Sequence, residues 1–237
     1  NDDRTVDINS YGSAPALWIA ADPSADLDLG PTSAPGGYGL HILGDVSGRG
    51  VQDGVEATAI RIEGLGGSNV TTAAGVSNEG TILSLSHEAD STALFIGANA
   101  DVPTINNIGF ITAQSTTELA SQVHGILIDS TATGVNAIAN SGTIQASVGG
   151  ELAEVVAIRD ESGTLSSIDN TGSIFVQLLG ANGVPVTETG TRIAIDVSNS
   201  VSGVTITQTQ NADVNIQELI HGDILFGSGG DTIDLSA

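Results

Sequence analysis

A seven-residue pattern, apolar-x-Asn-x-Gly-x-apolar, occurs four times in this chain and constrains its fold more than any other feature. We call each copy an Asn box. The boxes cover residues 76–82, 105–111, 138–144 and 168–174, so their first residues lie 29, 33 and 30 positions apart. Repeats of this period are typical of solenoids. A unit so short cannot bury an apolar face alone, and the pattern therefore predicts a stack of equivalent turns.

A second pattern precedes each Asn box and consists of two β-favouring apolar residues separated by one residue. Alternation over three to five residues predicts short strands with one face inward, and helical spacing is not sustained anywhere. The sequence therefore predicts an all-β fold, a single-stranded parallel β-helix (β-solenoid) with turns of roughly 30 residues. The pairs are Ile60/Ile62, Leu94/Ile96, Ile126/Ile128, Val156/Ile158 and Ile193/Ile195.

The Asn and Gly of each box are interpreted as structural residues at a bend. Asn tolerates the left-handed region of backbone conformation, and Gly adopts a positive φ without steric cost. In stacked turns the Asn side chains would form one column and hydrogen-bond to each other. The predicted bend residues are Asn78, Gly80, Asn107, Gly109, Asn140, Gly142, Asn170 and Gly172.

The spacing divides the chain into three regions. Residues 1–59 are expected to form short or irregular turns, in which Leu17-x-Ile19 and Leu40-x-Ile42 begin the series of pairs with steps of 23 and 20 residues. Residues 60–210 are the regular repeats. Residues 211–237 are rich in Gly and Asp and are read as a further turn or a β-roll.

The Gly-x-Asp-x-apolar pattern of the last region is similar to that of Ca²⁺-binding β-rolls. Carboxylate oxygens are ligands that Ca²⁺ prefers. Asp223 and Asp231 are therefore the candidate metal ligands, and no other cofactor is expected.

Charge limits the partners that this chain can have. It contains 28 acidic and five basic residues, for a net charge of −23. Such a surface repels phosphate backbones and anionic lipids, so we expect no nucleic-acid partner. The longest apolar run, residues 16–21, is too short to span a bilayer, so we expect no membrane insertion of this segment. Without Met at position 1 or a basic and apolar leader, the segment is expected to be mature or excised.

The Ile-Ala-Asn-Ser-Gly-Thr-Ile box, the aliphatic pairs and the closing Gly-Asp-Ile-Leu-Phe-Gly-Ser-Gly-Gly-Asp-Thr-Ile-Asp-Leu run resemble the passenger region of bacterial autotransporter proteins. The resemblance covers roughly residues 40–237. It implies a right-handed parallel β-helix, in agreement with the general preference of parallel crossovers, and a location on the bacterial cell surface or in the medium. Passengers of this family are mostly adhesins and biofilm or surface-layer components, and more rarely enzymes.

Alignment of the pairs produces one charge constellation, in which Asp129, Arg159 and Asp196 are outward neighbours on successive turns. A β-helix that cleaves polysaccharides would use paired carboxylates with a nearby cation. No aromatic platform for a sugar ring accompanies them, so we interpret the three residues as an ion-pair ladder and assign no catalytic residue. The adjacent outward positions in this alignment are Leu127, Ala157 and Ala194.

Two functions are compatible with these patterns. The first is a non-enzymatic extracellular structural or adhesive protein, either an adhesin or a self-assembling filament subunit. Its partner would be a second copy, a host or abiotic surface, or a glycan, with recognition placed in the insertions at 113–125 and 180–190. The alternative is a carbohydrate-active enzyme, a polysaccharide lyase or hydrolase, using the face with Asp129, Arg159 and Asp196.

Overall fold

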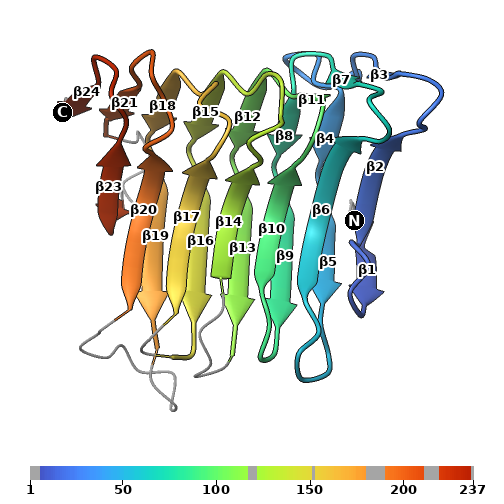
Figure 1. Cartoon of the computed structure of the whole chain (residues 1–237), viewed down its shortest axis with the longest axis horizontal. Coiled ribbons are helices and arrows are strands. Elements are labelled where there is room, and N and C mark those ends of the chain that lie inside the picture. The colour runs from blue at the N-terminus through green and yellow to red at the C-terminus, as the bar shows by residue number, and fades with distance from the viewer. Residues whose placement is uncertain (1–5, 117–121, 151–152, 180–189, 211–218, 236–237) are drawn as a thin grey trace, which may run out of the picture.

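A computed structural model describes residues 6–116, 122–150, 153–179, 190–210 and 219–235 of the chain. The insertion at 180–190 thus lies outside the described residues except for its last residue. The described residues form 24 strands and no helix. They accordingly include no helix long and apolar enough to cross a membrane. The strands stack along one axis, with the N-terminal strands at one end and the C-terminal strands at the other (Figure 1).

Two long parallel sheets form two walls of the solenoid. Sheet A contains, in spatial order, β1 (Ile8–Tyr11), β5 (Asp45–Arg49), β9 (Thr81–Ser86), β13 (Phe110–Ser115), β16 (Thr143–Val148), β19 (Ser173–Leu178) and β22 (Leu219–His221). Sheet B contains β2 (Leu17–Ala21), β6 (Ala57–Gly64), β10 (Ser91–Ile96), β14 (Gln122–Ile128), β17 (Glu154–Asp160), β20 (Thr191–Val197) and β23 (Asp223–Phe226).

The third wall consists of sheet D with the small sheet C beside it. Sheet D contains β4 (Leu40–Ile42), β8 (Val76–Asn78), β12 (Thr104–Asn107), β15 (Ala137–Asn140), β18 (Ser167–Asn170), β21 (Thr205–Gln208) and β24 (Thr232–Leu235). Sheet C contains β3 (Leu27–Leu29), β7 (Val70–Thr72) and β11 (Ala100–Asp101).

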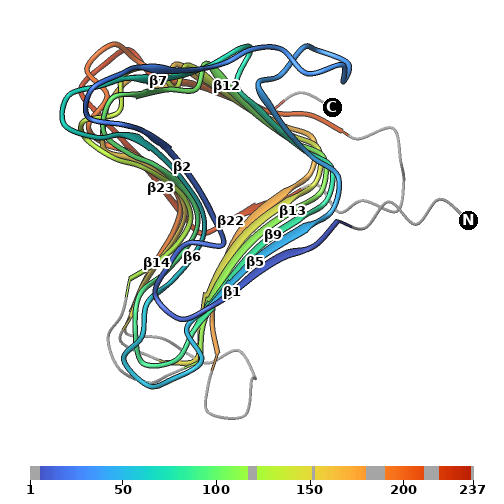
Figure 2. The ribbon, with the colours of Figure 1, turned by 90° about the vertical axis from the view of Figure 1, so that its right-hand side faces the viewer.

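The chain visits sheets A, B and D once in every turn and passes through sheet C in the early turns. Seen from the N-terminal end it runs clockwise as it recedes from the viewer, so the coil is right-handed (Figure 2). Sheet B bows toward the axis, whereas sheet A is nearly straight (Figure 2). The predicted right-handed parallel β-helix is therefore confirmed.

Rows of aliphatic side chains fill the interior. Equivalent inward positions on successive turns are occupied by similar residues because each strand pairs in parallel with its counterpart one turn away. Burying one such side chain contributes about 2 kcal/mol. β-Branched residues suit this setting, because they pack well on a pleated surface. One row consists of Ile60, Leu94, Ile126, Ile158 and Ile195, all fully buried.

The four box asparagines form the predicted column, which we call the amide ladder. Asn78 Nδ2 donates to Asn107 Oδ1 at 2.8 Å, Asn107 Nδ2 to Asn140 Oδ1 at 2.7 Å, and Asn140 Nδ2 to Asn170 Oδ1 at 2.7 Å. The ladder ends with Gln208, whose Oε1 accepts from Asn170 Nδ2 at 2.6 Å. All four asparagines are buried, so these bonds satisfy amide groups that water cannot reach; the exception is Asn78 Oδ1, at the start of the ladder, which accepts no hydrogen bond from the described residues.

The box glycines are needed for a different reason from the predicted one. None of them has a positive φ. Instead, a Cβ at Gly109 would collide with the carbonyl oxygen of Gly80 on the preceding turn, and one at Gly142 with that of Gly109. The expected left-handed conformation is therefore wrong, and close approach between turns selects Gly. The column begins one turn before the first box, where Gly44 faces Gly80 in the same way.

The first turn also differs from its prediction. Leu17 pairs with Ile60 in sheet B, as expected, but Leu40 pairs with Val76 in sheet D. Leu40-x-Ile42 therefore belongs to the column of Asn boxes, and the series of pairs steps 43 residues from Leu17 to Ile60. The assignment failed because an apolar-x-apolar strand reads the same in either sheet, and Ile42 occupies the position that Asn holds in later turns.

Replacing Asn107 with Ala should destabilise the solenoid strongly. The change removes one acceptor of Asn78 Nδ2, which keeps only its bond to Phe110 O, and removes the donor to Asn140 Oδ1, so two buried groups each lose a hydrogen bond. We expect the free energy of unfolding in urea to fall by about 2–4 kcal/mol. Asn106→Ala is the matched control, because this partly buried neighbour donates to Ser77 Oγ only at 3.2 Å, and it should cost less than about 1 kcal/mol. Equal losses for the two variants would contradict a special role of the ladder.

Candidate functional site

A charged cluster lies on the outer face of sheet B, around Arg159 of β17. Arg159 donates through Nη1 to Glu154 Oε1 at 2.7 Å and through Nε to Asp196 Oδ2 at 3.2 Å. Its Nη1 also lies 3.3 Å from Nε2 of His124. Burial opposes ionisation of the guanidinium, but Glu154 and Asp196 outweigh it and raise the pKa of Arg159. The cluster is a compact ion-pair network in which one cation serves two carboxylates.

The predicted ladder is only half present in this cluster. Arg159 and Asp196 are in register on neighbouring strands, as expected. Asp129 is not, because Arg159 pairs with Leu127. Asp129 instead lies at the next corner, where its carboxylate accepts from Thr131 N at 2.9 Å. The prediction that Asp129 is the neighbour of Arg159 is therefore wrong, because the true register of β14 and β17 differs from the predicted one by two residues.

Asp160 explains this error. It faces inward opposite Ile128, at a position where apolar residues recur on earlier turns, and is only 2% exposed. Its carboxylate accepts from the backbone nitrogens of Ser162, Gly163 and Leu165 at 2.9, 3.1 and 3.0 Å, which offsets the cost of burial. The structural counterparts of Ile126 and Ile128 on β17 are Ile158 and Asp160. Because Asp160 is acidic, the search for two apolar residues chose Val156 and Ile158 instead.

The outward row of sheet B is different once the register is corrected. We call it the Trp18 row, and its members are Trp18, Arg61, Phe95, Leu127, Arg159 and Asp196. The first three occupy the middle position of the apolar pairs, which is the signal that could have identified them. Ala157 and Ala194, expected to be outward, are fully buried.

Trp18 and Arg61 are held by a shared carboxylate, and Arg61 in turn contacts Phe95. Glu63 accepts from Trp18 Nε1 at 3.0 Å and from Arg61 Nε and Nη2 at 2.7 and 2.6 Å. The Arg61 guanidinium lies over the Phe95 ring, 4.5 Å from its centroid. Gly97 gives the ring room, since a Cβ there would lie 2.6 Å from Phe95 Cε1. The Glu63 side chain is 9% exposed, whereas Trp18 is 54% exposed.

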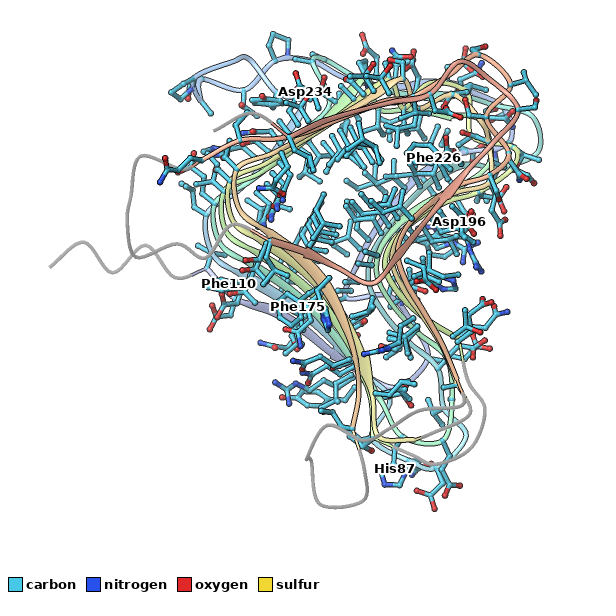
Figure 3. The ribbon with its side chains drawn as sticks, turned by 90° about the vertical axis from the view of Figure 1, so that its left-hand side faces the viewer. His87, Phe110, Phe175, Asp196, Phe226 and Asp234 are labelled. Carbon is cyan, nitrogen blue, oxygen red and sulfur yellow. The ribbon has the colours of Figure 1, made fainter. Side chains whose placement is uncertain are left out.

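The outer face of sheet A has no charge over four consecutive strands. β9, β13, β16 and β19 contain no acidic or basic residue, although the chain carries a net charge of −23. Phe110, which is 56% exposed, and Phe175 project from this face (Figure 3). The remaining outward residues are Leu, Thr, Ser and Gln. This face can approach another surface without bringing carboxylates to it.

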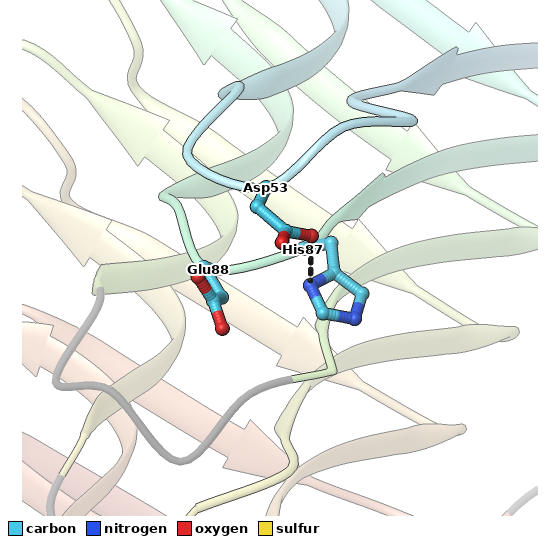
Figure 4. A group of neighbouring side chains, drawn as sticks. All are labelled: Asp53, His87 and Glu88. Atoms are coloured by element: carbon cyan, nitrogen blue, oxygen red, sulfur yellow. Dashed lines mark ion pairs between the residues drawn. The ribbon is translucent and has the colours of Figure 1, made fainter.

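Three exposed side chains could together hold a divalent cation. Oxygen or nitrogen atoms of Asp53, His87 and Glu88 all lie within 4.8 Å of one another, and His87 Nδ1 is 3.1 Å from Asp53 Oδ1 (Figure 4). One imidazole and two carboxylates suit a cation such as Zn²⁺. The same contacts are those of an ordinary solvated ion pair, which is the simpler account of three exposed groups.

The structure gives one of the two predicted Ca²⁺ ligands another role. Asp231 Oδ1 accepts from Val204 N at 2.8 Å, which ties the last described turn to the one before it. Asp223 is exposed on β23. Neither Asp223 nor Asp231 belongs to the group of possible metal ligands found among the described residues, which is Asp53, His87 and Glu88. Calcium binding at Asp223 and Asp231 stays a prediction.

Comparison of the chain with models of known protein families, with curated proteins and with solved structures found no match.

His124 should make the stability of the protein depend on pH. Burial, and secondly the charge of Arg159, lower the pKa of His124 from 6.5 to about 4. The unfolded state therefore binds this proton more readily, so stability is complete above pH 6.5 and falls as the pH drops toward 4. Relative to His124→Gln, wild-type protein should lose up to about 3 kcal/mol of unfolding free energy over this range.

Urea unfolding at a series of pH values measures this difference. The control is His221→Gln, which changes an exposed histidine on β22 and should keep the wild-type pH dependence. Parallel curves for wild-type protein and His124→Gln would show that His124 is not the group responsible.

Proposed function

We propose that this chain is a non-enzymatic extracellular solenoid with a structural or adhesive function, an adhesin or a filament subunit of a bacterial cell surface. The single observation that supports it most is the uncharged outer face of sheet A. Strongly acidic proteins repel each other and most biological surfaces, so a neutral face is where contact costs least. The resemblance to autotransporter passengers supports the location on the cell surface.

The shape of sheet A favours extended partners. It is nearly straight, so its outward residues form a plane that suits a flat surface or a second copy rather than a small ligand (Figure 2). Phe110 and Phe175 add apolar area to this plane. Neutral polar residues such as Thr112 and Gln145 surround them, and removing these residues from water costs less free energy than removing charged groups would.

Introducing charge into this plane should abolish contact. The double variant Thr112→Glu/Gln145→Glu places two carboxylates on neighbouring strands. We expect it to reduce adsorption to polystyrene and to bacterial cells by about tenfold or more, because each carboxylate would have to be desolvated. Any filaments or paired rods seen by electron microscopy of the wild-type protein should disappear with it.

The matched control changes the charge of another sheet by the same amount. Ala139→Glu/Asn106→Glu places two carboxylates at paired outward positions of sheet D and should keep adsorption and assembly. Unchanged adsorption of the sheet A variant, or equal losses for both variants, would contradict a role of sheet A in contact.

The second candidate is a polysaccharide lyase or hydrolase, favoured by the cluster of His124, Glu154, Arg159 and Asp196. A general base needs a free carboxylate, and here Arg159 binds both Glu154 and Asp196. An enzyme at this face should release products from a glycan panel and lose that activity on Asp196→Asn. Absence of product from every glycan removes this candidate and leaves the adhesive function untouched.

A further inference from the structure

We propose that the Trp18 row is a binding site for a neutral, extended saccharide chain. The site lies on sheet B and is independent of the contact face on sheet A. It is built from Trp18, Arg61 and Phe95 with Glu63 beneath them, and it continues along the solenoid axis to Leu127.

The exposed indole of Trp18 is the first part of the argument. A large aromatic side chain that is more than half exposed keeps much of its apolar ring in water unless a ligand covers it. Its one polar group is already used, because Nε1 donates to Glu63. What remains for a ligand is the apolar ring, whose quadrupole attracts the polarised C–H groups of a sugar face.

The site is also rigid before any ligand arrives. Glu63 is buried and accepts three hydrogen bonds, which fix the Trp18 ring and the Arg61 guanidinium together. The guanidinium is further held over Phe95, and Gly97 leaves the space that the Phe95 ring occupies. Binding to such a surface costs little side-chain entropy, which is one of the costs of association.

Charge decides which ligands are accepted. Arg61 is neutralised by the bidentate contact with Glu63, so the row offers no net charge to an ion. The acidic surroundings of a chain with net charge −23 repel polyanions. Guanidinium N–H groups not facing Glu63 can still donate to hydroxyl oxygens. A neutral polyhydroxylated chain satisfies all of these conditions.

The arrangement of the backbone favours a saccharide over an extended peptide. β6, β10 and β14 are each hydrogen-bonded to a strand on both sides, so no backbone edge is free beneath Arg61, Phe95 and Leu127. A peptide could add as a strand only at the outer edge of β2, where it would lie beside Trp18 without crossing Arg61, Phe95 and Leu127. Trp18 and Phe95 lie two strands apart, roughly 10 Å, which leaves a sugar ring room against each aromatic and lets a chain run along the row.

Trp18 is the single tryptophan of the chain, so tryptophan fluorescence, excited selectively over the two tyrosines, reports on this site alone. The probes are β-1,4-linked hexasaccharides of glucose, N-acetylglucosamine and mannose, with an oligogalacturonate as the anionic probe. We expect a saturable shift of Trp emission with at least one neutral probe, with a Kd of about 1 mM or below, and no shift with the anionic one. Absence of a saturable change with all three neutral probes at about ten times that Kd overturns the proposal. So does an equal response to the anionic probe.

Variants test whether the row makes the contact. Phe95→Ala should raise Kd about tenfold by removing one aromatic contact, and Arg61→Gln should do the same by removing the guanidinium that fixes Glu63 and Phe95 in place. Phe110→Ala, an exposed aromatic on sheet A, is the matched control and should leave Kd unchanged. Circular dichroism melting verifies that each variant is folded. The titration of the wild-type protein tests the proposal even if a variant fails to fold. If Phe110→Ala and Phe95→Ala weaken binding equally, the site is not the Trp18 row.

The outcome is separable from that of the proposed function. Thr112→Glu/Gln145→Glu lies on the other wall and should still bind the hexasaccharide that the wild-type protein binds. Loss of adsorption with intact saccharide binding supports both proposals. Intact adsorption with no saccharide binding removes only the second.

Discussion

Parallel pairing of equivalent strands one turn apart is the constraint on which every other feature of this solenoid depends. It fixes which residues become neighbours, because each position on one strand faces its counterpart on the next. The amide ladder, the glycine column, the aliphatic rows and the Trp18 row are all consequences of that register. A feature that is trivial on one turn, such as an outward Arg, becomes part of a surface only through the residues stacked above and below it.

The sequence predicted the sheet D corner well because two residue types, Asn and Gly, recur there in every turn from 76 to 174. The box Asn must reach its counterpart, and the box Gly must let two backbones approach, so both recur visibly. The corner nevertheless extends beyond the visible boxes, to Gln208 at one end and Gly44 at the other. These were missed because Gln can replace Asn where the ladder ends, and because Gly44 stands in a turn without Asn.

Sheet B was predicted less well because alternation with period two does not specify register. A shift of two residues keeps every apolar side chain inside, so Val156 and Ile158 looked as suitable as Ile158 and Asp160. Only the pairing of Ile126 with Ile158 decides between them. The error had a functional cost, since it moved Asp129 into the cluster of Arg159 and hid the alignment of Leu127 with Arg159. Tertiary register, unlike strand content, is therefore the information that a single sequence lacks here.

The amide ladder also gives the solenoid a direction. Each Asn nitrogen donates toward the C-terminal neighbour. The first three also donate to a backbone carbonyl there, as Asn107 Nδ2 does to Thr143 O at 3.1 Å and Asn140 Nδ2 to Ser173 O at 3.2 Å. Reversing one amide would place two oxygens face to face, so all amides share one orientation. A duplicated or deleted turn would meet donors and acceptors already in the right order. The chain can therefore change its length by whole turns, through recombination between boxes, without redesign of its interior.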